Sequence, residues 1–108
     1  MGKDKRNLGD LRHRVLERLK GVQDPELKTD VVSLGLIREL SVDEGGRVHI
    51  VFRPTSPLCP LAFKIALDIR EAAEEVEGVR EVEVEAVDFL WANQLRAFLK
   101  GAREDGLT

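Results

Sequence analysis

The sequence has a single cysteine, Cys59, so an internal disulfide is impossible and a reducing compartment is expected. No apolar run approaches the ~20 residues that span a bilayer. Residues 1–6 are charged and no apolar stretch follows them, which is not the pattern of a signal peptide. The net charge of −3 argues against general nucleic-acid binding, which usually needs a basic surface. We therefore expect a cytoplasmic protein with no membrane and no nucleic-acid partner.

Several common motifs are also missing. The glycines do not have the spacing of a phosphate-binding loop, and no two soft ligands recur at zinc-finger spacing. There is no internal repeat or low-complexity stretch, and 108 residues suit one domain over 1–108. Charged residues make up 34% of the chain and amide side chains are scarce, a composition that suggests a thermophilic source.

Hydrophobic periodicity predicts six main elements. Apolar residues at helical spacing predict helices over 7–21, 60–77 and 89–100, the first capped by Asn7 and the last by Asp88. We expect residues 1–6 to be a flexible tail and residues 89–108 to be a C-terminal helix and tail. Alternating patterns predict strands over 36–42, 47–53 and 79–87, the first two joined by a glycine-containing hairpin loop at 43–46. A short helical turn is expected where Asp24 precedes Pro25.

The strand over 79–87 shows the clearest alternation. Valines at 82 and 84 alternate with Glu81, Glu83 and Glu85, so one face is buried and the other is wet. Arginines on the wet face of the second strand would pair with these glutamates if the two strands were neighbours. The helix between those strands allows them to run parallel. The fold class is thus α/β (α+β): a two-layer sandwich with a small mixed three-stranded sheet, helices on one face, and the order α-β-β-α-β-α.

The segment from Pro54 to Leu61 is the most informative for chemistry. Pro60 suits the first position of a helix, which would place Cys59 at the N-cap, near free backbone N–H groups. Those groups favour a thiolate by about 0.3–2 kcal/mol, and the thiolate is the form that binds metal. The alternative is that Cys59 is a small buried hydrophobe.

Other candidates have equally plain alternatives. The hydroxyls of Thr55 and Ser56 could support a thiolate or simply stabilise a turn. Asp24, Glu26 and Asp30 could edge a site or cap local backbone. His49 could act as a base, but its place in the alternation predicts a surface position. Trp91 and its helix could belong to the core or to a partner surface.

Three blocks of the sequence resemble the SufT-like/PaaD-like family of iron–sulfur cluster assembly proteins. The blocks are DPEL at 24–27, DVVSLGLI at 30–37 and TSPLCPL at 55–61. The family often has Asp where Ser33 stands, and its C-terminal Trp-and-Pro segment is reduced here to Trp91. The resemblance implies the fold of iron–sulfur assembly domains. It also implies that Cys59 is the functional thiol, with Thr55 and Asp24–Glu26 at the site.

The resemblance further implies a maturation factor (a carrier, targeting or scaffold partner) rather than an enzyme. The expected cofactor is an iron–sulfur cluster, bound transiently or shared between chains, with Cys59 as its metal ligand. The expected partners are the assembly machinery and client apoproteins, and a homodimer is one arrangement. Two alternatives stay open. One is a non-enzymatic adaptor that uses the Glu81/Glu83/Glu85 face and the Trp91 helix, and the other is a thiol-dependent enzyme acting on a small electrophile.

Overall fold

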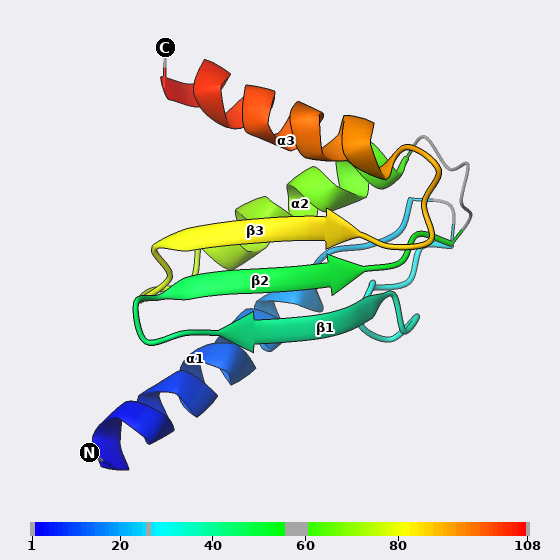
Figure 1. Ribbon diagram of the computed structural model, residues 1–108. Coiled ribbons are helices and arrows are strands. Elements are labelled where there is room, and N and C mark those ends of the chain that lie inside the picture. Colours follow the sequence, from blue (N-terminus) through cyan, green and yellow to red (C-terminus); the bar gives the residue numbers. More distant parts are fainter. Residues whose placement is uncertain (1, 26, 56–60, 108) are drawn as a thin grey trace.

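The computed structural model describes residues 2–25, 27–55 and 61–107. Its elements follow the predicted order of helix, two strands, helix, strand and helix (Figure 1). They are α1 (Gly2–Leu19), β1 (Ile37–Val42), β2 (Arg47–Phe52), α2 (Ala62–Glu74), β3 (Glu81–Ala86) and α3 (Ala92–Leu107). None of the helices among the described residues is long and apolar enough to cross a membrane.

The three strands form one mixed sheet in the order β1-β2-β3. β1 and β2 are antiparallel, and their loop is held by Asp43, whose Oδ1 accepts the N–H groups of Gly45 (2.8 Å) and Arg47 (3.0 Å). β2 and β3 are parallel, with Ile50 opposite Val84. The crossover through α2 supplies the length that a parallel connection needs.

One face of the sheet carries the core. Inward residues of β2 and β3, such as Ile50 and Val84, pack against the apolar stripe of α2 and the buried side of α1. Figure 1 shows α1 and α2 behind the sheet, with α3 alongside β3. The predicted apolar stripe is confirmed: Ala62, Ile65, Ala66, Ile69 and Ala73 of α2 are buried, and so is Val76, which follows the end of the helix.

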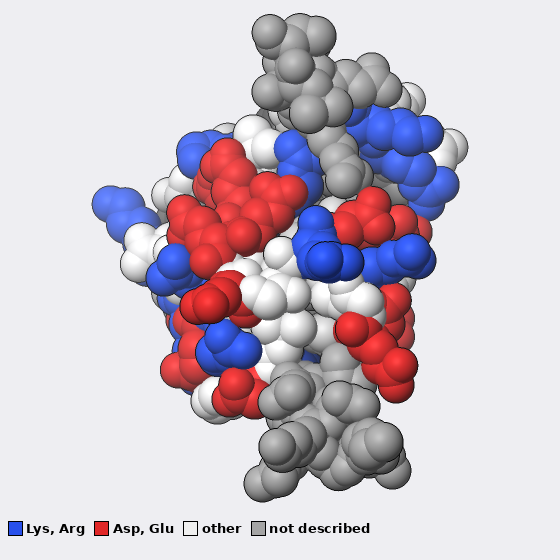
Figure 2. Space-filling model, turned by 90° about the vertical axis from the view of Figure 1, so that its left-hand side faces the viewer, with Lys and Arg blue, Asp and Glu red and all other residues white. Residues whose placement is uncertain are grey.

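The opposite face carries the charged residues of β2 and β3. Arg47 Nε lies 3.8 Å from Glu81, and His49 Nε2 lies 3.7 Å from Glu83 and 3.9 Å from Glu85. The Arg47–Glu81 pair is of the cross-strand arginine–glutamate kind that the alternation predicted. On the side where β2 and β3 begin, both acidic and basic side chains reach the surface, so neither sign covers the whole face (Figure 2).

The N-terminal helix begins earlier than predicted. We expected a tail over 1–6 and a cap at Asn7, but α1 runs without interruption from Gly2 to Leu19. The apolar pattern gives no sign of this extension because it begins only at Leu8. Once a helix is nucleated, each further residue adds a backbone hydrogen bond, so the helix can run past the part that packs.

The two later helices begin after the predicted residues. The N-cap of α2 is Leu61, so the prediction that Cys59 occupies this position is wrong. The N–H of Ile65 donates to the Leu61 carbonyl (2.9 Å), which fixes the first turn there. Asp88 does not cap α3, which begins at Ala92. The Asp88 backbone has a φ of 51°, and its carboxylate lies 3.3 Å from Arg53 Nε. A long-range ion pair thus replaces the local cap.

Candidate functional site

A pocket of about 670 Å³ lies where β2 and β3 end. Because β1 is antiparallel to β2, the residues that precede β1 reach the same end of the sheet. The described residues that line the pocket are Leu34, Gly35, Leu36, Arg38, Arg53, Pro54, Thr55, Asp88, Phe89 and Leu90. The carboxyl ends of neighbouring parallel strands are a common place for ligand sites in α/β proteins.

Thr55 is the predicted site residue that the structure places in this pocket. It is exposed and follows Pro54, which is buried and anchors the end of β2. Thr55 directly precedes the segment 56–60, and the chain is described again from Leu61. The predicted site residues Ser56 and Cys59 lie outside the described residues. The structure therefore places both ends of the segment that carries the thiol and gives no geometry for the sulfur.

Asp24 is deeply buried, with an exposed fraction of 2%. Its Oδ1 accepts the N–H of Leu27 (3.1 Å), and its carbonyl accepts the N–H of Lys28 (2.7 Å). The predicted cap of a short turn at Pro25 is thereby confirmed. Asp24 is not among the described residues that line the pocket, and Glu26 lies outside the described residues. A role for these two residues at the cluster site stays a prediction.

Asp30 also binds local backbone. Its Oδ2 accepts the N–H groups of Val32 (3.1 Å) and Ser33 (3.0 Å). Hydrogen bonds from the Ser33 side chain and backbone hold the pKa of the Asp30 carboxyl below its ordinary value. Among the described residues, no group of three or more His, Cys, Asp or Glu side chains could hold a metal ion. In the loop between α1 and β1, the acids for which geometry is described stabilise turns.

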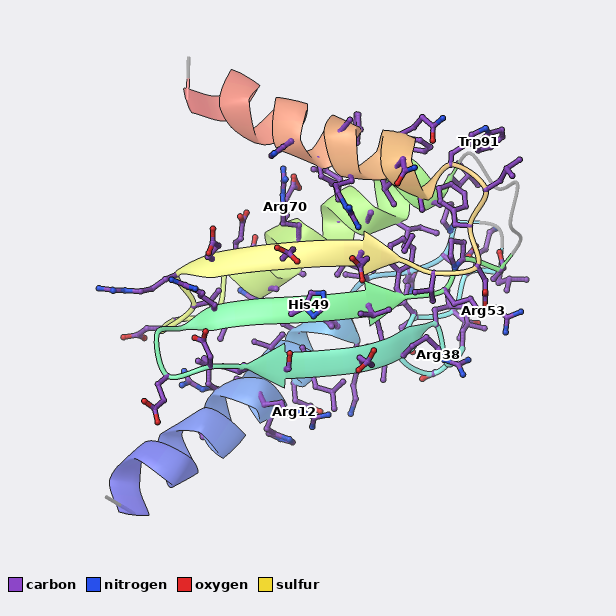
Figure 3. The ribbon with its side chains drawn as sticks, in the orientation of Figure 1. Arg12, Arg38, His49, Arg53, Arg70 and Trp91 are labelled. Carbon is purple, nitrogen blue, oxygen red and sulfur yellow. The ribbon has the colours of Figure 1, made fainter. Side chains whose placement is uncertain are left out.

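His49 lies on the charged outer face of the sheet, as the alternation predicted (Figure 3). Its side chain is 42% exposed and faces the glutamates of β3. It is not among the described residues of the pocket. The geometry therefore gives no support to the hypothesis that His49 acts as a base for the thiol.

Sequence reasoning missed Arg38. The strand pattern put Leu36, Leu40 and Val42 on one face, and strict alternation would have turned Arg38 inward with them. The register between β1 and β2 instead shifts between Ile37 and Glu39, so that Arg38 is an extra residue in β1. This β-bulge leaves Arg38 exposed at the pocket. The sequence did contain a signal for the bulge, because the alternation places the charged Arg38 at an inward position between Leu36 and Leu40.

The aromatic residues near the pocket form a connected cluster. The Phe89 ring contacts the Trp91 ring edge-on at 5.9 Å and the Phe63 ring at 6.0 Å, and the Phe63 ring contacts that of Phe98 at 5.5 Å. Phe89 is buried and Trp91 half-buried, whereas Leu90 is 66% exposed and Phe98 41%. The Trp91 segment thus contributes to the core and also presents apolar surface beside the pocket.

Comparison with known proteins identifies the family. A sequence model of the family described as iron-sulfur cluster assembly protein matches residues 12–86. The chain belongs to this family of iron–sulfur cluster assembly proteins. The match includes the three sequence blocks, and with them Cys59 and Thr55.

Individual relatives agree with the family match. The chain is 38% identical over 77 residues to the Fe-S protein maturation auxiliary factor YitW of Bacillus subtilis, covering 71% of this chain and 76% of YitW. It is 42% identical over 71 residues to an iron-sulfur cluster carrier protein of Deinococcus radiodurans, covering 66% of this chain but only 20% of that protein. A crystal structure of a domain of unknown function, DUF59, from Bacillus anthracis has a TM-score of 0.72 and 32% identity. That match covers 81% of this chain and 80% of the other.

Proposed function

We propose that this protein is a maturation factor that handles an iron–sulfur cluster as cargo, with the Cys59 thiolate as its ligand. The observation that carries the proposal is the family match over residues 12–86, which includes the Thr55–Cys59 segment. The pocket supports it, because Thr55, the first residue of that segment, lines this concave surface. The names of the relatives, a maturation auxiliary factor and a cluster carrier, support the same role.

The single cysteine limits how the cargo can be held. Common clusters take four cysteine thiolates, and one chain supplies one. The remaining ligands must come from a second copy of the chain, an assembly protein, a client apoprotein or small thiols. The contact with the cluster is therefore transient or shared, which suits a factor that passes cargo on. The partners of the proposal are the assembly machinery and the client apoproteins.

Anaerobic reconstitution with iron and sulfide tests the role of Cys59. We expect the wild-type chain, alone or with an assembly partner, to acquire the visible absorption of a bound cluster. We expect Cys59→Ala and Cys59→Ser to acquire none, because neither side chain supplies a thiolate. Thermal unfolding of each variant shows that the fold is intact. A cluster retained at wild-type yield in Cys59→Ala would contradict the proposal.

A matched pair of threonine variants tests the pocket. Thr55 and Thr29 are both exposed, but only Thr55 lines the pocket. We expect Thr55→Val to lower the yield of bound cluster because the pocket loses a hydroxyl donor. Thr29 is not among the described residues that line the pocket, so Thr29→Val serves as the control and should keep the wild-type yield of bound cluster.

The exposed apolar surface at Leu90 and Phe98 favours a second candidate function, an adaptor that brings the assembly machinery to a client. The glutamates of β3 are weaker candidates for such contacts, since Glu83 faces His49 and Glu85 pairs with Arg96 at 3.0 Å. If the adaptor role is the main one, Cys59→Ala keeps its partner binding while Leu90→Ser loses it. A pull-down of a known assembly partner distinguishes the two functions.

A further inference from the structure

The β-bulge in β1 places a cation at the pocket, where no described residue pairs with its side chain. Arg38 is exposed, and it makes no hydrogen bond or ion pair with any described residue. We propose that Arg38 forms an anion-binding rim on the pocket that receives the thiolate-ligated cluster itself. This inference rests on the proposed function, because it assigns the rim to the same cargo.

The bulge is the first observation behind the proposal. An extra residue in a strand disrupts the hydrogen-bonded ladder and leaves one residue unpaired, so it carries a cost in sheet stability. Here the residue released from the ladder is an arginine, and it reaches the end of the sheet at which Thr55 leaves β2. Figure 3 shows Arg38 and Arg53 at the same end of the sheet. A bulge that only bent the strand would not require a cation at this position.

The charges around the pocket are the second observation. Arg53 Nε lies 3.3 Å from Asp88 Oδ2, so this pair largely neutralises itself. Arg38 is the one charged residue that remains among the described residues of the pocket, which gives them a net charge of +1. The chain as a whole has a net charge of −3, so the pocket has the opposite sign to the molecule. The rim would attract an anion to the pocket, whereas the net negative charge of the whole chain repels one.

The chemistry of the cargo matches this rim. A cluster held by four thiolates is an anion, since the sulfides and thiolates together outweigh the charge on iron. Its sulfur atoms accept hydrogen bonds, and the guanidinium offers several N–H donors in one plane.

The test measures loading of the full-length chain with a [2Fe–2S] cluster ligated by glutathione. Loading is followed by the absorption that stays with the protein after removal of free cluster, at low and at high salt. We compare the wild type with Arg38→Gln, with Arg38→Lys, which keeps the charge, and with Arg80→Gln, an exposed arginine outside the pocket.

We expect Arg38→Gln to weaken loading about fivefold at low salt, the size of one exposed charge interaction. The difference should shrink at high salt, because ions screen the attraction. Arg38→Lys should retain most of the affinity, and Arg80→Gln should match the wild type. Unfolding curves confirm that the variants are folded.

A second arm uses a cluster ligated by 2-mercaptoethanol, which has no carboxylate. The same dependence on Arg38 is expected with this probe. A dependence seen only with the glutathione cluster would mean that the rim recognises carboxylates, as on an acidic partner, and would overturn the inference. Equal loading of Arg38→Gln and the wild type would also overturn it, while Cys59-dependent loading would still support the proposed function. If the wild type loads neither probe, the carrier function fails first and the inference falls with it.

Discussion

At the scale of single residues, Gly46 has the closest backbone contact among the described glycines. Its φ is 82°, and a Cβ at this position would lie 2.6 Å from the carbonyl oxygen of Gly78. Its own carbonyl accepts the N–H of Arg80 (2.8 Å), so the β1–β2 loop and the start of β3 meet through backbone. A side chain would have to push the two segments apart. Only glycine satisfies both the conformation and the contact.

A pair of alanine substitutions separates these two effects. Gly35 also has a positive φ, 74°, but a Cβ there would meet nothing within 4 Å. We expect Gly35→Ala to lower the free energy of unfolding by about 1 kcal/mol, from backbone strain alone. Gly46→Ala should cost about 3 kcal/mol, because a clash with backbone is added. Urea unfolding of both variants gives the comparison, and equal losses would show that the contact at Gly78 is easily relieved.

At the scale of elements, the attachment of α3 depends on few polar contacts. β3 is an edge strand, and α3 lies alongside it (Figure 1). Arg70 extends from α2 into the space between β3 and α3 (Figure 3), where its Nη1 donates to the Leu99 carbonyl at 2.7 Å. Leu95 and Leu99 supply the buried apolar contacts of α3. The helix α3 thus shields the edge of the sheet. The half-buried Arg70 connects α3 to α2 through its bond to Leu99.

Replacing this arginine should loosen α3 selectively. Arg70→Met keeps the aliphatic stem and removes the bond to Leu99, and we expect a loss of about 1 kcal/mol in unfolding free energy. Amide hydrogen exchange over residues 92–101 should become faster than in the wild type. The control is Arg96→Met, which breaks an exposed ion pair with Glu85 (3.0 Å) and should change both measurements little. Unchanged exchange in Arg70→Met would mean that apolar packing alone holds α3.

At the scale of the whole molecule, the supply of cluster ligands decides the assembly. One chain offers one thiol, and the described residues hold no group of His, Cys, Asp or Glu suited to a metal. A cluster bound through Cys59 alone would leave most of its iron sites to other ligands. A cluster-bearing species made only of this protein must therefore contain more than one chain.

Native mass spectrometry after anaerobic reconstitution measures the number of chains in the cluster-bearing species. With glutathione present but no partner protein, we expect the iron-containing species to hold two chains and one cluster, with Cys59 from each chain and two glutathione thiolates completing the four ligands. Removal of iron by a chelator should return the sample to its state before reconstitution. Cys59→Ala should form no iron-dependent assembly. A cluster found on a single chain, with no other ligand present, would contradict the shared-cargo proposal.

The order of the elements, the buried stripe of α2, the alternation of β3 and the cap at Asp24 could all be predicted from the sequence. Each depends on residues within a few positions of one another, so the local pattern contains the information. The place of Thr55 at the end of a strand was predictable for the same reason. The positions of Cys59, Ser56 and Glu26 stay predictions from the sequence and the family.

The tertiary structure alone decided the features that depend on distant residues. Asp88 pairs with Arg53 instead of capping α3, α2 begins at Ala62 rather than at the proline, and the bulge turns Arg38 to the pocket. Asp88 and Arg38 are set by contacts with another element, the ion pair with Arg53 and the register against β2, rather than by a local preference. The amino-acid pattern therefore determined which elements form and which face is buried. The packing of those elements determined which charges meet at the pocket, because that choice depends on neighbours far away in the chain.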